Sequence, residues 1–237
     1  MQPTASTSTS GKFIVLDGND GSGKATQSAL LVAHLEKEGI LTEKVDFPAY
    51  DTNFFGALIG ECLRGEHGDF VHMDPKIASS LYALDRLESA PHILESLEKG
   101  MVVIADRFSS SNQIHQGGKI ADENDRTKFL EWLDRMEHDV LGIPRPDAII
   151  YLRVPVEISL KLLSEKRKAK NGGLADGQKD TVEEDRNYLD RSHETANWLA
   201  ATQSNWHIID CYEDEAMRTR ESISEEIAIV ISKLLQR

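Results

Sequence analysis

The chain has 237 residues, of which 40% are hydrophobic and 28% are charged. This length allows a sizeable buried core, and this composition excludes a largely disordered chain. Asp and Glu total 40 against 27 Lys and Arg, and the resulting net charge of −13 opposes duplex binding through a broad basic surface. Any polyanionic ligand must therefore meet a local positive site.

The chain carries no clear export or membrane signal. Residues 1–11 are rich in Ser and Thr, and we predict a disordered tail there, followed by a single domain over residues 12–237. Apolar stretches are too short to span a bilayer. Cys62 and Cys211 fit neither a disulfide framework nor a CxxC motif. We expect buried free thiols, a cytoplasmic location, and neither nucleic acid nor membrane as a partner.

The domain starts with the pattern strand, glycine-rich loop, helix. Residues 13–17 (FIVLD) form an apolar run, and residues 26–37 carry apolar side chains at helical spacing. Between them lies the G-x-x-x-x-G-K spacing of a Walker A loop, whose amides and lysine surround phosphate groups. We predict that this loop binds the phosphates of ATP through Gly18, Asp20, Gly21, Ser22, Gly23, Lys24, Ala25 and Thr26.

One position departs from the Walker A pattern. The residue after the lysine is usually Ser or Thr, which ligates Mg²⁺, but here it is Ala25. Thr26 is one residue late and, on a helix, points about 100° away. A carboxylate must therefore help to hold the metal, and Asp20 and Asp106 are the nearest candidates.

Strands and helices alternate along the rest of the chain. The apolar runs predict strands at residues 41–47, 101–105, 148–152 and 207–210. The helical patterns lie at residues 53–63, 75–88, 91–99, 126–140, 156–166, 182–202 and 220–235. This alternation predicts an α/β fold with three layers, in which helices flank a parallel sheet of about five strands.

An acidic and a basic residue follow the strand at residues 101–105. Asp106 has the placement of a Walker B acid, although an acid there could equally cap the next element. Arg107 can bind a phosphate through two hydrogen bonds, and a buried guanidinium without an anionic partner would be costly. Ligands of such sheets gather at the carboxyl ends of the strands, so both side chains are candidates for a phosphate site.

Five motifs in order carry a family resemblance. They are DGSGK at 20–24, FPAY at 47–50, YALDR at 82–86, DRFSSSN at 106–112 and GIPRPD at 142–147. In this order the sequence resembles thymidylate (dTMP) kinases, which are P-loop nucleoside monophosphate kinases. The resemblance runs from about residue 12 to residue 210. It implies ATP-dependent phosphorylation of dTMP to dTDP for dTTP biosynthesis, with Mg²⁺ as cofactor and a homodimer as the assembly.

The resemblance also implies an acceptor pocket for dTMP. Arg86 and Asn112 match positions that hydrogen-bond the thymine edge, and Tyr82 matches an aromatic that stacks on the base. By themselves, Tyr82 and Arg86 would also suit an ordinary amphipathic helix. The remaining positions are Phe47 and Pro48 beside the 5-methyl group, Tyr50, Asp20 and Arg107 around the acceptor phosphate and its metal, and Ser111, His115 and Gln116.

Two positions differ from the family pattern. Ala49 stands where many relatives carry an arginine, and His115 stands where a Tyr or Phe usually discriminates against a 2′-hydroxyl. The polar contacts of such a pocket reject the wrong base, whereas a methyl pocket contributes only about 1–3 kcal/mol. We therefore expect thymine to be preferred over cytosine more sharply than over uracil.

The basic, glycine-rich residues 166–180 resemble the mobile lid of nucleoside monophosphate kinases. Phosphoryl transfer needs cations around the γ-phosphoryl oxygens, and Gly21 stands where some relatives place an arginine. We expect Arg167 to join Lys24 and Arg107 as a catalytic cation, with Lys168 and Lys170 behind it. Asp180 and Glu183 either cap the next helix or hold Mg²⁺ through water.

Two alternatives stay open from the residues. One is another nucleoside monophosphate or deoxynucleoside kinase, which would share the loop and lid but not the acceptor pocket. The other is a non-catalytic nucleotide-binding switch, suggested by Ala25. A partition-type ATPase would need a lysine early in the loop, where this chain has Asn19 and Asp20.

Overall fold

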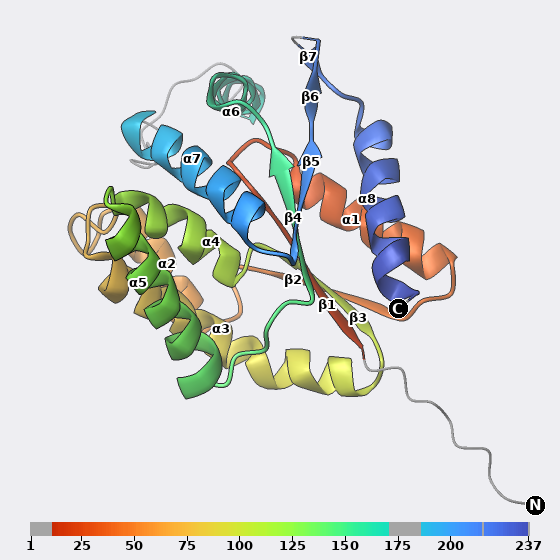
Figure 1. Cartoon of the computed structure of the whole chain (residues 1–237), viewed down its shortest axis with the longest axis horizontal. Coiled ribbons are helices and arrows are strands. Elements are labelled where there is room, and N and C mark those ends of the chain that lie inside the picture. Colours follow the sequence, from red (N-terminus) through yellow and green to blue (C-terminus); the bar gives the residue numbers. More distant parts are fainter. Residues whose placement is uncertain (1–10, 171–185, 215, 237) are drawn as a thin grey trace, which may run out of the picture.

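The computed structural model describes residues 11–170, 186–214 and 216–236, and its centre is a parallel sheet (Figure 1). Five strands lie in the order β2-β3-β1-β4-β5, and every neighbouring pair is parallel. The strands are β1 (Lys12–Gly18), β2 (Thr42–Asp46), β3 (Val102–Asp106), β4 (Ala148–Arg153) and β5 (Trp206–Asp210). The predicted α/β class is confirmed, and each predicted strand is present with ends shifted by a residue or so.

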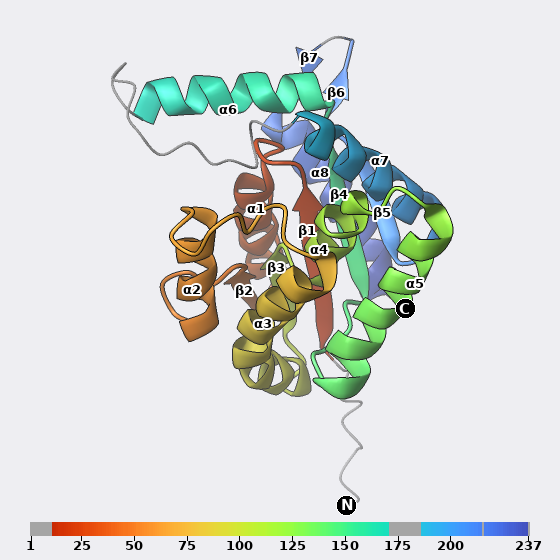
Figure 2. The same cartoon turned by 90° about the vertical axis from the view of Figure 1, so that its left-hand side faces the viewer.

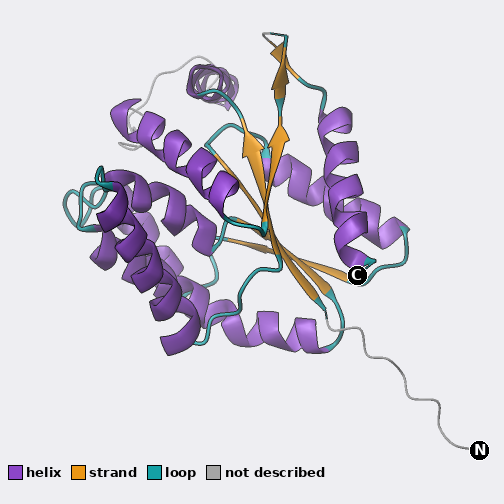
Figure 3. Ribbon diagram, viewed as in Figure 1, coloured by secondary structure: helices purple, strands orange, loops and turns teal. Residues whose placement is uncertain are grey.

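Helices cover both faces of the sheet (Figures 1 and 3). Phe13 and Val15 of β1 belong to the core beneath α3 (Pro75–Glu98), α5 (Glu123–Asp134) and α7 (Arg186–Thr202). Ile14 and Leu16 belong to the opposite core, beneath α1 (Lys24–Lys37) and α8 (Arg220–Leu235). Successive side chains of a strand point to opposite faces, so a strand covered on both sides is a continuous apolar run.

The structure corrects the prediction of separate helices at residues 75–88 and 91–99. A single helix, α3, continues through Pro91. A proline inside a helix removes one backbone hydrogen bond, which favoured a break in the sequence pattern. Ala90 and Ile93, on either side of Pro91, are both buried in the core against the sheet. Packing of the helix on the sheet therefore outweighs the local preference.

The predicted helix over residues 126–140 is two elements. α5 begins earlier, at Glu123, because Asp122 caps it by accepting a hydrogen bond from the amide of Asp125. From Arg135 to Val140 the chain forms a π-helix, η2. Such wide turns place side chains differently from a regular helix and often occur at functional sites.

Several elements stand at the carboxyl end of the sheet, where Figure 2 shows α6 (Val156–Lys170) lying across it. α6 extends the predicted helix from residue 166 to Lys170, so the first part of the predicted lid is helical, because Lys, Arg and Ala favour helix. Residues 171–180 of that lid lie outside the described residues. The remaining elements of the described chain are α2 (Phe54–Leu63), α4 (Ser109–His115), the 3₁₀ turn η1 (Gly117–Lys119), β6 (Tyr212–Glu213) and β7 (Ala216–Met217).

The cysteine prediction is confirmed, since Cys62 and Cys211 are both buried and free. Burial raises the pKa of the Cys211 thiol to about 12. Over the described ranges, no helix combines the length and the apolar character required to cross a membrane. Residues 1–10 of the predicted tail are outside the described part, while the amide of Gly11 donates to the carbonyl oxygen of Leu97.

Candidate active site at the carboxyl edge of the sheet

The glycine-rich loop connects β1 directly to α1, as the sequence predicted. Gly18 closes the strand at φ 155°, and a Cβ there would lie 2.7 Å from the Leu152 carbonyl oxygen and 2.7 Å from Ser22 Oγ. Only glycine fits this close approach. The Ser22 amide donates to the Asn19 carbonyl, and Ser22 Oγ is buried without a partner among the described residues. The loop therefore places amides and a hydroxyl at the N-terminus of a 14-residue helix.

Lys24 lies inside this loop and is 7% exposed. Its ammonium donates to the carbonyl oxygens of Gly18 and Asn19, both at 2.9 Å. Burial lowers the pKa of Lys24 to about 8, with Arg107 acting in the same direction and Asp20 against it. Ala25 and Thr26 are exposed at the start of α1. The ammonium is thus held at the centre of the loop, where phosphate oxygens can replace the two carbonyls.

Arg107 connects the loop to the end of β3. Its backbone is left-handed, with φ 66°, and its guanidinium pairs with Asp20 and lies 3.6 Å from Asp17. Burial works to lower the pKa of Arg107, but the Asp20 and Asp17 carboxylates raise it overall. Burial works to raise the pKa of Asp20, but Arg107 and Lys24 lower it well below its usual range. Arg107 and Asp20 are therefore both charged at physiological pH.

The carboxylates of the phosphate region differ in what they can offer a metal. Asp17 is fully engaged, since it accepts hydrogen bonds from the Ser110 and Ser111 hydroxyls and the Gly18 amide. Burial raises the pKa of Asp106, although Lys24 opposes this, and no described residue donates a hydrogen bond to its carboxylate. The described residues contain no group of three potential ligands that could hold a metal unaided. Asp106 fits a Mg²⁺ site only if phosphate oxygens and water complete the shell, as is usual for Mg²⁺.

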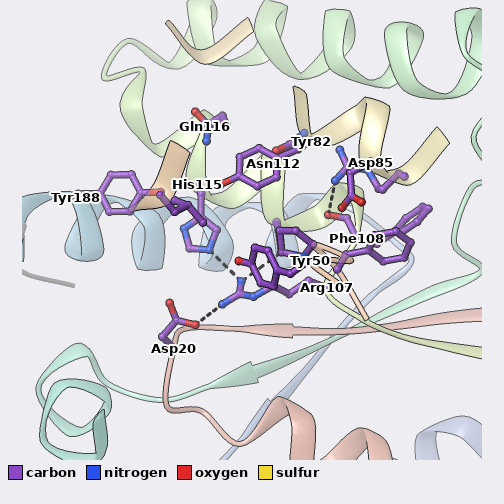
Figure 4. A pocket seen from close by; sticks show the side chains of 15 residues that line it. Asp20, Tyr50, Tyr82, Asp85, Arg107, Phe108, Asn112, His115, Gln116 and Tyr188 are labelled. Carbon is purple, nitrogen blue, oxygen red and sulfur yellow. Dashed lines mark hydrogen bonds and ion pairs between the residues drawn. The ribbon is translucent and has the colours of Figure 1, made fainter. Parts of the chain in front are cut away.

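A pocket of about 250 Å³ opens beside Arg107 and is shown in Figure 4. Every residue of the predicted acceptor set lines it: Asp20, Phe47, Pro48, Tyr50, Tyr82, Arg86, Arg107, Ser111, Asn112, His115 and Gln116. The structure thus brings together side chains from α3, from α4 and the residue after it, and from the three loops that follow β1, β2 and β3. We call Asp20 and Arg107 with Lys24, which are predicted phosphate contacts, the phosphate end, and Tyr82, Arg86 and Asn112, which are predicted base contacts, the base end.

The base end rests on a buried acid. Arg86 Nε donates to Glu137 Oε2 at 2.9 Å, and Nη2 donates to Glu137 Oε1 at 2.6 Å. Asn112 Nδ2 donates to the same Oε1 and to the Ser79 carbonyl oxygen, both at 3.2 Å. The Arg86 guanidinium also lies over the Phe108 ring, 5.6 Å from its centroid. Both predicted base-contacting residues are therefore fixed in position.

The loop at residues 47–50 forms another wall of the pocket. Phe47 packs edge-on against Phe108, with ring centroids 5.2 Å apart. Asp85 holds the loop from α3, because its carboxylate accepts from the Ala49 amide at 3.1 Å and from Asn53 Nδ2 at 2.9 Å. Burial raises the pKa of Asp85, and the bond from Asn53 opposes this shift. Asp85 is thus a support for the loop, next to Arg86 in the chain.

His115 lies between the two ends. Its Nε2 is 3.3 Å from Arg107 Nη1, and its ring stacks on Tyr188 with centroids 5.9 Å apart. Burial, followed by the Arg107 charge, lowers the pKa of His115 to about 4, so the ring is neutral and Nε2 accepts the hydrogen bond. Its Nδ1 and Gln116 Oε1 are buried without partners among the described residues. Both atoms are available to a ligand.

The sequence did not single out five residues of this site. Asp85 and Phe108 lie within the motifs YALDR and DRFSSSN, which could have indicated them. Leu63 and Tyr188 also line the pocket, and nothing in their local sequence indicates it. Glu137 lies 51 residues from Arg86 on a helical segment, where a glutamate is usually exposed.

The predicted lid and metal residues are only partly within the described structure. Arg167, Lys168 and Lys170 lie on the last turns of α6, but their side chains are outside the described part. Asp180 and Glu183 lie outside the described residues altogether. Their assigned roles in catalysis and metal binding therefore stay predictions.

Comparison with known proteins agrees with the motifs. Residues 16–223 match the family described as Thymidylate kinase. The thymidylate kinase of Mycobacterium tuberculosis (strain ATCC 25618 / H37Rv) is 34% identical over 148 residues, which cover 62% of this chain and 68% of the relative. That of Thermosipho melanesiensis is 28% identical over 204 residues, 85% of this chain and 90% of the relative. The Arabidopsis thaliana enzyme is 27% identical over 219 residues, 92% and 71% of the respective chains. The chain therefore belongs to the thymidylate kinase family.

Proposed function

We propose that this protein transfers the γ-phosphoryl group of ATP to dTMP, giving ADP and dTDP for dTTP synthesis. The observation that carries the proposal is the single pocket that joins Arg107, beside the phosphate loop, to Arg86 and Asn112. Figure 4 draws Asp20 and Arg107 near the end of β1, with Asn112 and Tyr82 farther from it. A nucleoside monophosphate has the same division, with an anionic phosphate at one end and a neutral base at the other.

The donor nucleotide would bind at the glycine-rich loop. Its phosphate oxygens would take over the hydrogen bonds that Lys24 now gives to Gly18 and Asn19. Amides at the N-terminus of α1 would add positive potential. Lys24 would then neutralise the charge that develops as the bond between the β and γ phosphates breaks.

The acceptor needs no general base. A phosphate monoester has its second pKa at about 6, so the attacking oxygen of dTMP is already largely ionised at neutral pH. Arg107 would hold this phosphate in line with the donor, and most of the rate would come from alignment and charge neutralisation. Arg167, on α6, is our candidate for a further cation at the transferred group.

Magnesium would enter with ATP. We propose Asp106 as the carboxylate that helps to hold it, with Asp20 as a second candidate, because Asp106 receives no hydrogen bond from a described residue whereas Asp17 is fully engaged. Asp180 and Glu183 are additional candidates from the family resemblance. The ion would supply charge neutralisation on the phosphates, which the missing hydroxyl at Ala25 does not prevent.

The proposed assembly follows from the family resemblance, and the proposed compartment follows from the two free cysteines. We propose a homodimer, which agrees with large exposed apolar side chains at Phe54 of α2 and Ile77 of α3, 75% and 61% exposed. Light scattering on the purified protein would measure its mass directly. We also propose a cytoplasmic location, to be tested by fractionating cells that contain the tagged protein.

A direct assay tests the reaction. The purified protein is given ATP and Mg²⁺ with dTMP, dUMP, dCMP or dGMP in turn, and the nucleoside diphosphates are separated by chromatography. We expect dTDP to form fastest, with a stronger preference over dCMP than over dUMP. Faster turnover of another monophosphate would assign a different kinase, and ATP binding without turnover of any acceptor would assign a non-catalytic switch. Neither the family match nor the relatives supports these two alternatives.

A further inference from the structure

Glu137 is a buried acid with no place in the reaction described above. Its side chain is 0% exposed, and both carboxylate oxygens accept hydrogen bonds from Arg86. Oε1 accepts a further one from Asn112. A carboxylate is expensive to bury, and it is tolerated only where such hydrogen bonds compensate for lost water. Glu137 therefore connects the two residues that would read the base.

The first consequence of this contact concerns charge. Arg86 is only 3% exposed in its side chain, and its charge is matched by Glu137 at 2.6 Å. A buried guanidinium without this partner would attract an anion. With the carboxylate in place, the base end presents N–H donors without a net charge. That combination suits a neutral base and leaves the phosphate to Arg107.

The second consequence concerns the Asn112 amide. Nδ2 gives its two hydrogens to Glu137 Oε1 and the Ser79 carbonyl oxygen. Both are acceptors, so the amide nitrogen must point toward them and the amide oxygen away. No described residue donates to this oxygen. The pocket therefore offers an acceptor from Asn112 beside donors from Arg86.

This pattern distinguishes pyrimidines. Thymine carries an acceptor at O4 and a donor at N3–H, which complement an arginine donor beside an amide acceptor. Cytosine carries a donor at N4 and an acceptor at N3, so both contacts would be mismatched. Unpaired polar groups in a buried site are costly, and this cost gives strong discrimination.

The π-helix η2 places Glu137 in this position. Residues Arg135–Val140 form π-helical turns, in which Glu137 is buried while the neighbouring Arg135 and Asp139 are exposed. The Ile143 amide donates to the Glu137 carbonyl oxygen at 3.0 Å, which ties the turn to the following loop. A widened turn thus places a single acid beneath the pocket.

We propose that Glu137 is a positioning residue for base selection: it cancels the charge of Arg86 and turns the Asn112 amide so that the pair matches thymine and rejects cytosine. This inference rests on the proposed function of the same pocket. Glu137 would not touch dTMP itself and would act only through Arg86 and Asn112.

The test uses the full-length variants Glu137→Gln, Arg86→Gln and the double variant. Glu131→Gln is the matched control, because it makes the same chemical change at an exposed site on α5. Steady-state kinetics with dTMP, dCMP and ATP are combined with thermal unfolding. Glu137→Gln should raise the KM for dTMP about 10- to 100-fold and reduce the preference for dTMP over dCMP about tenfold or more. The KM for ATP should not change, and Glu131→Gln should behave as the wild type.

Because a lone buried Arg86 could prevent folding of Glu137→Gln, the double variant supplies a second comparison. It contains neither charge, and its selectivity should equal that of Arg86→Gln, because the Arg86 donors are already absent and the amide oxygen of the glutamine at position 137 can still accept from Asn112. Losses that multiply in the double variant would overturn the inference. So would a folded Glu137→Gln that keeps its dTMP preference, or one in which the KM values for ATP and dTMP rise together. Wild-type protein that makes no dTDP would instead refute the proposed function, and the inference with it.

Discussion

The pocket contains two arginines, each paired with an acid, and the two pairs differ in their access to water, because Arg86 is buried and Arg107 is half-buried. At the base end the side chains of Arg86 and Glu137 are 3% and 0% exposed. At the phosphate end those of Arg107 and Asp20 are 17% and 40% exposed. Water and ligands can therefore compete for the ionic contact of the second pair much more readily than for that of the first. The same ionic contact is permanent at one end and exchangeable at the other.

This difference assigns different tasks to the two arginines. Arg107 has Asp20 as a partner that an incoming phosphate can replace, and it keeps a strong attraction for anions. Arg86 is neutralised by Glu137 and offers only directed hydrogen bonds. A substrate with one charged end would accordingly bind in one orientation. Each prediction below removes a group from one end and asks whether the other end is affected.

The largest effect is expected at the phosphate loop. Lys24→Ala should lower kcat about 100- to 1,000-fold or more, because it removes the ammonium that would stabilise the transferred phosphoryl group. Since burial lowers the pKa of Lys24 to about 8, the fold disfavours this charge, and Tm at pH 7 should stay unchanged or rise. The preference among acceptors should persist in the residual activity. Steady-state kinetics would measure kcat and the acceptor preference, and calorimetry would measure Tm.

Lys37→Ala is the matched control for this variant, because Lys37 is exposed on the last turn of α1. It should leave kcat unchanged. Near-normal turnover of Lys24→Ala would contradict the role of the loop in phosphoryl transfer.

Arg107→Gly should have the next largest effect. Arg107 has φ 66°, a conformation that glycine adopts freely, so this change removes the guanidinium with little backbone strain. The KM for dTMP should rise about 10- to 100-fold, because two charge-assisted hydrogen bonds are lost and Asp20 then repels the phosphate. The ratio of dTMP to dCMP turnover should stay constant. Arg145→Gly, at an exposed arginine, is the control, and a loss of base preference in Arg107→Gly would show that the two ends are not independent.

Much of the phosphate end could be predicted from sequence because its parts are close in the chain. The loop from Gly18 to Lys24 is contiguous, and its glycines and lysine have a spacing that few other structures require. The strands were predictable for a similar reason, since β3 and β4 are buried on both faces and read as continuous apolar runs.

The support of the base end could not be predicted, because it depends on contacts between distant segments. Glu137 meets Arg86 across 51 residues, and the π-helical turn that buries it has no simple sequence pattern. Tyr188 of α7 likewise stacks on His115 of α4, which is distant from it in the chain. At Pro91 the rule that proline breaks a helix predicted two helices. This prediction was wrong, because packing of Ala90 and Ile93 against the sheet keeps α3 continuous.

A smaller effect is expected from Gly56→Ala on α2. A Cβ at Gly56 would lie 2.2 Å from the Ala49 carbonyl oxygen and 2.9 Å from Asp85 Oδ1. The loop at residues 47–50 must then move, which should lower the free energy of unfolding by about 1–3 kcal/mol. We expect a higher KM for dTMP and an unchanged KM for ATP, both from steady-state kinetics.

Gly117→Ala is the control for this substitution, because the nearest atom to its Cβ would be 3.6 Å away, an ordinary contact. It should change neither stability nor the KM for dTMP. If Gly56→Ala raised the KM for ATP as strongly as that for dTMP, the loop would serve both ends of the site rather than the acceptor alone.

The smallest effect concerns His115, which separates the two ends and faces Asp17, Asp20, Lys24 and Arg107. Burial and Arg107 lower its pKa from 6.5 to about 4, so on acidification the unfolded chain binds the proton first. The contribution of His115 to the free energy of unfolding is therefore highest above pH 6.5. It falls by about 1–3 kcal/mol as the pH is lowered toward 4. In His115→Phe this part of the pH dependence should disappear, and urea unfolding at several pH values would measure it. Parallel curves for the two proteins would mean that His115 becomes protonated in the fold as easily as in the unfolded chain, and that Arg107 does not hold the ring neutral.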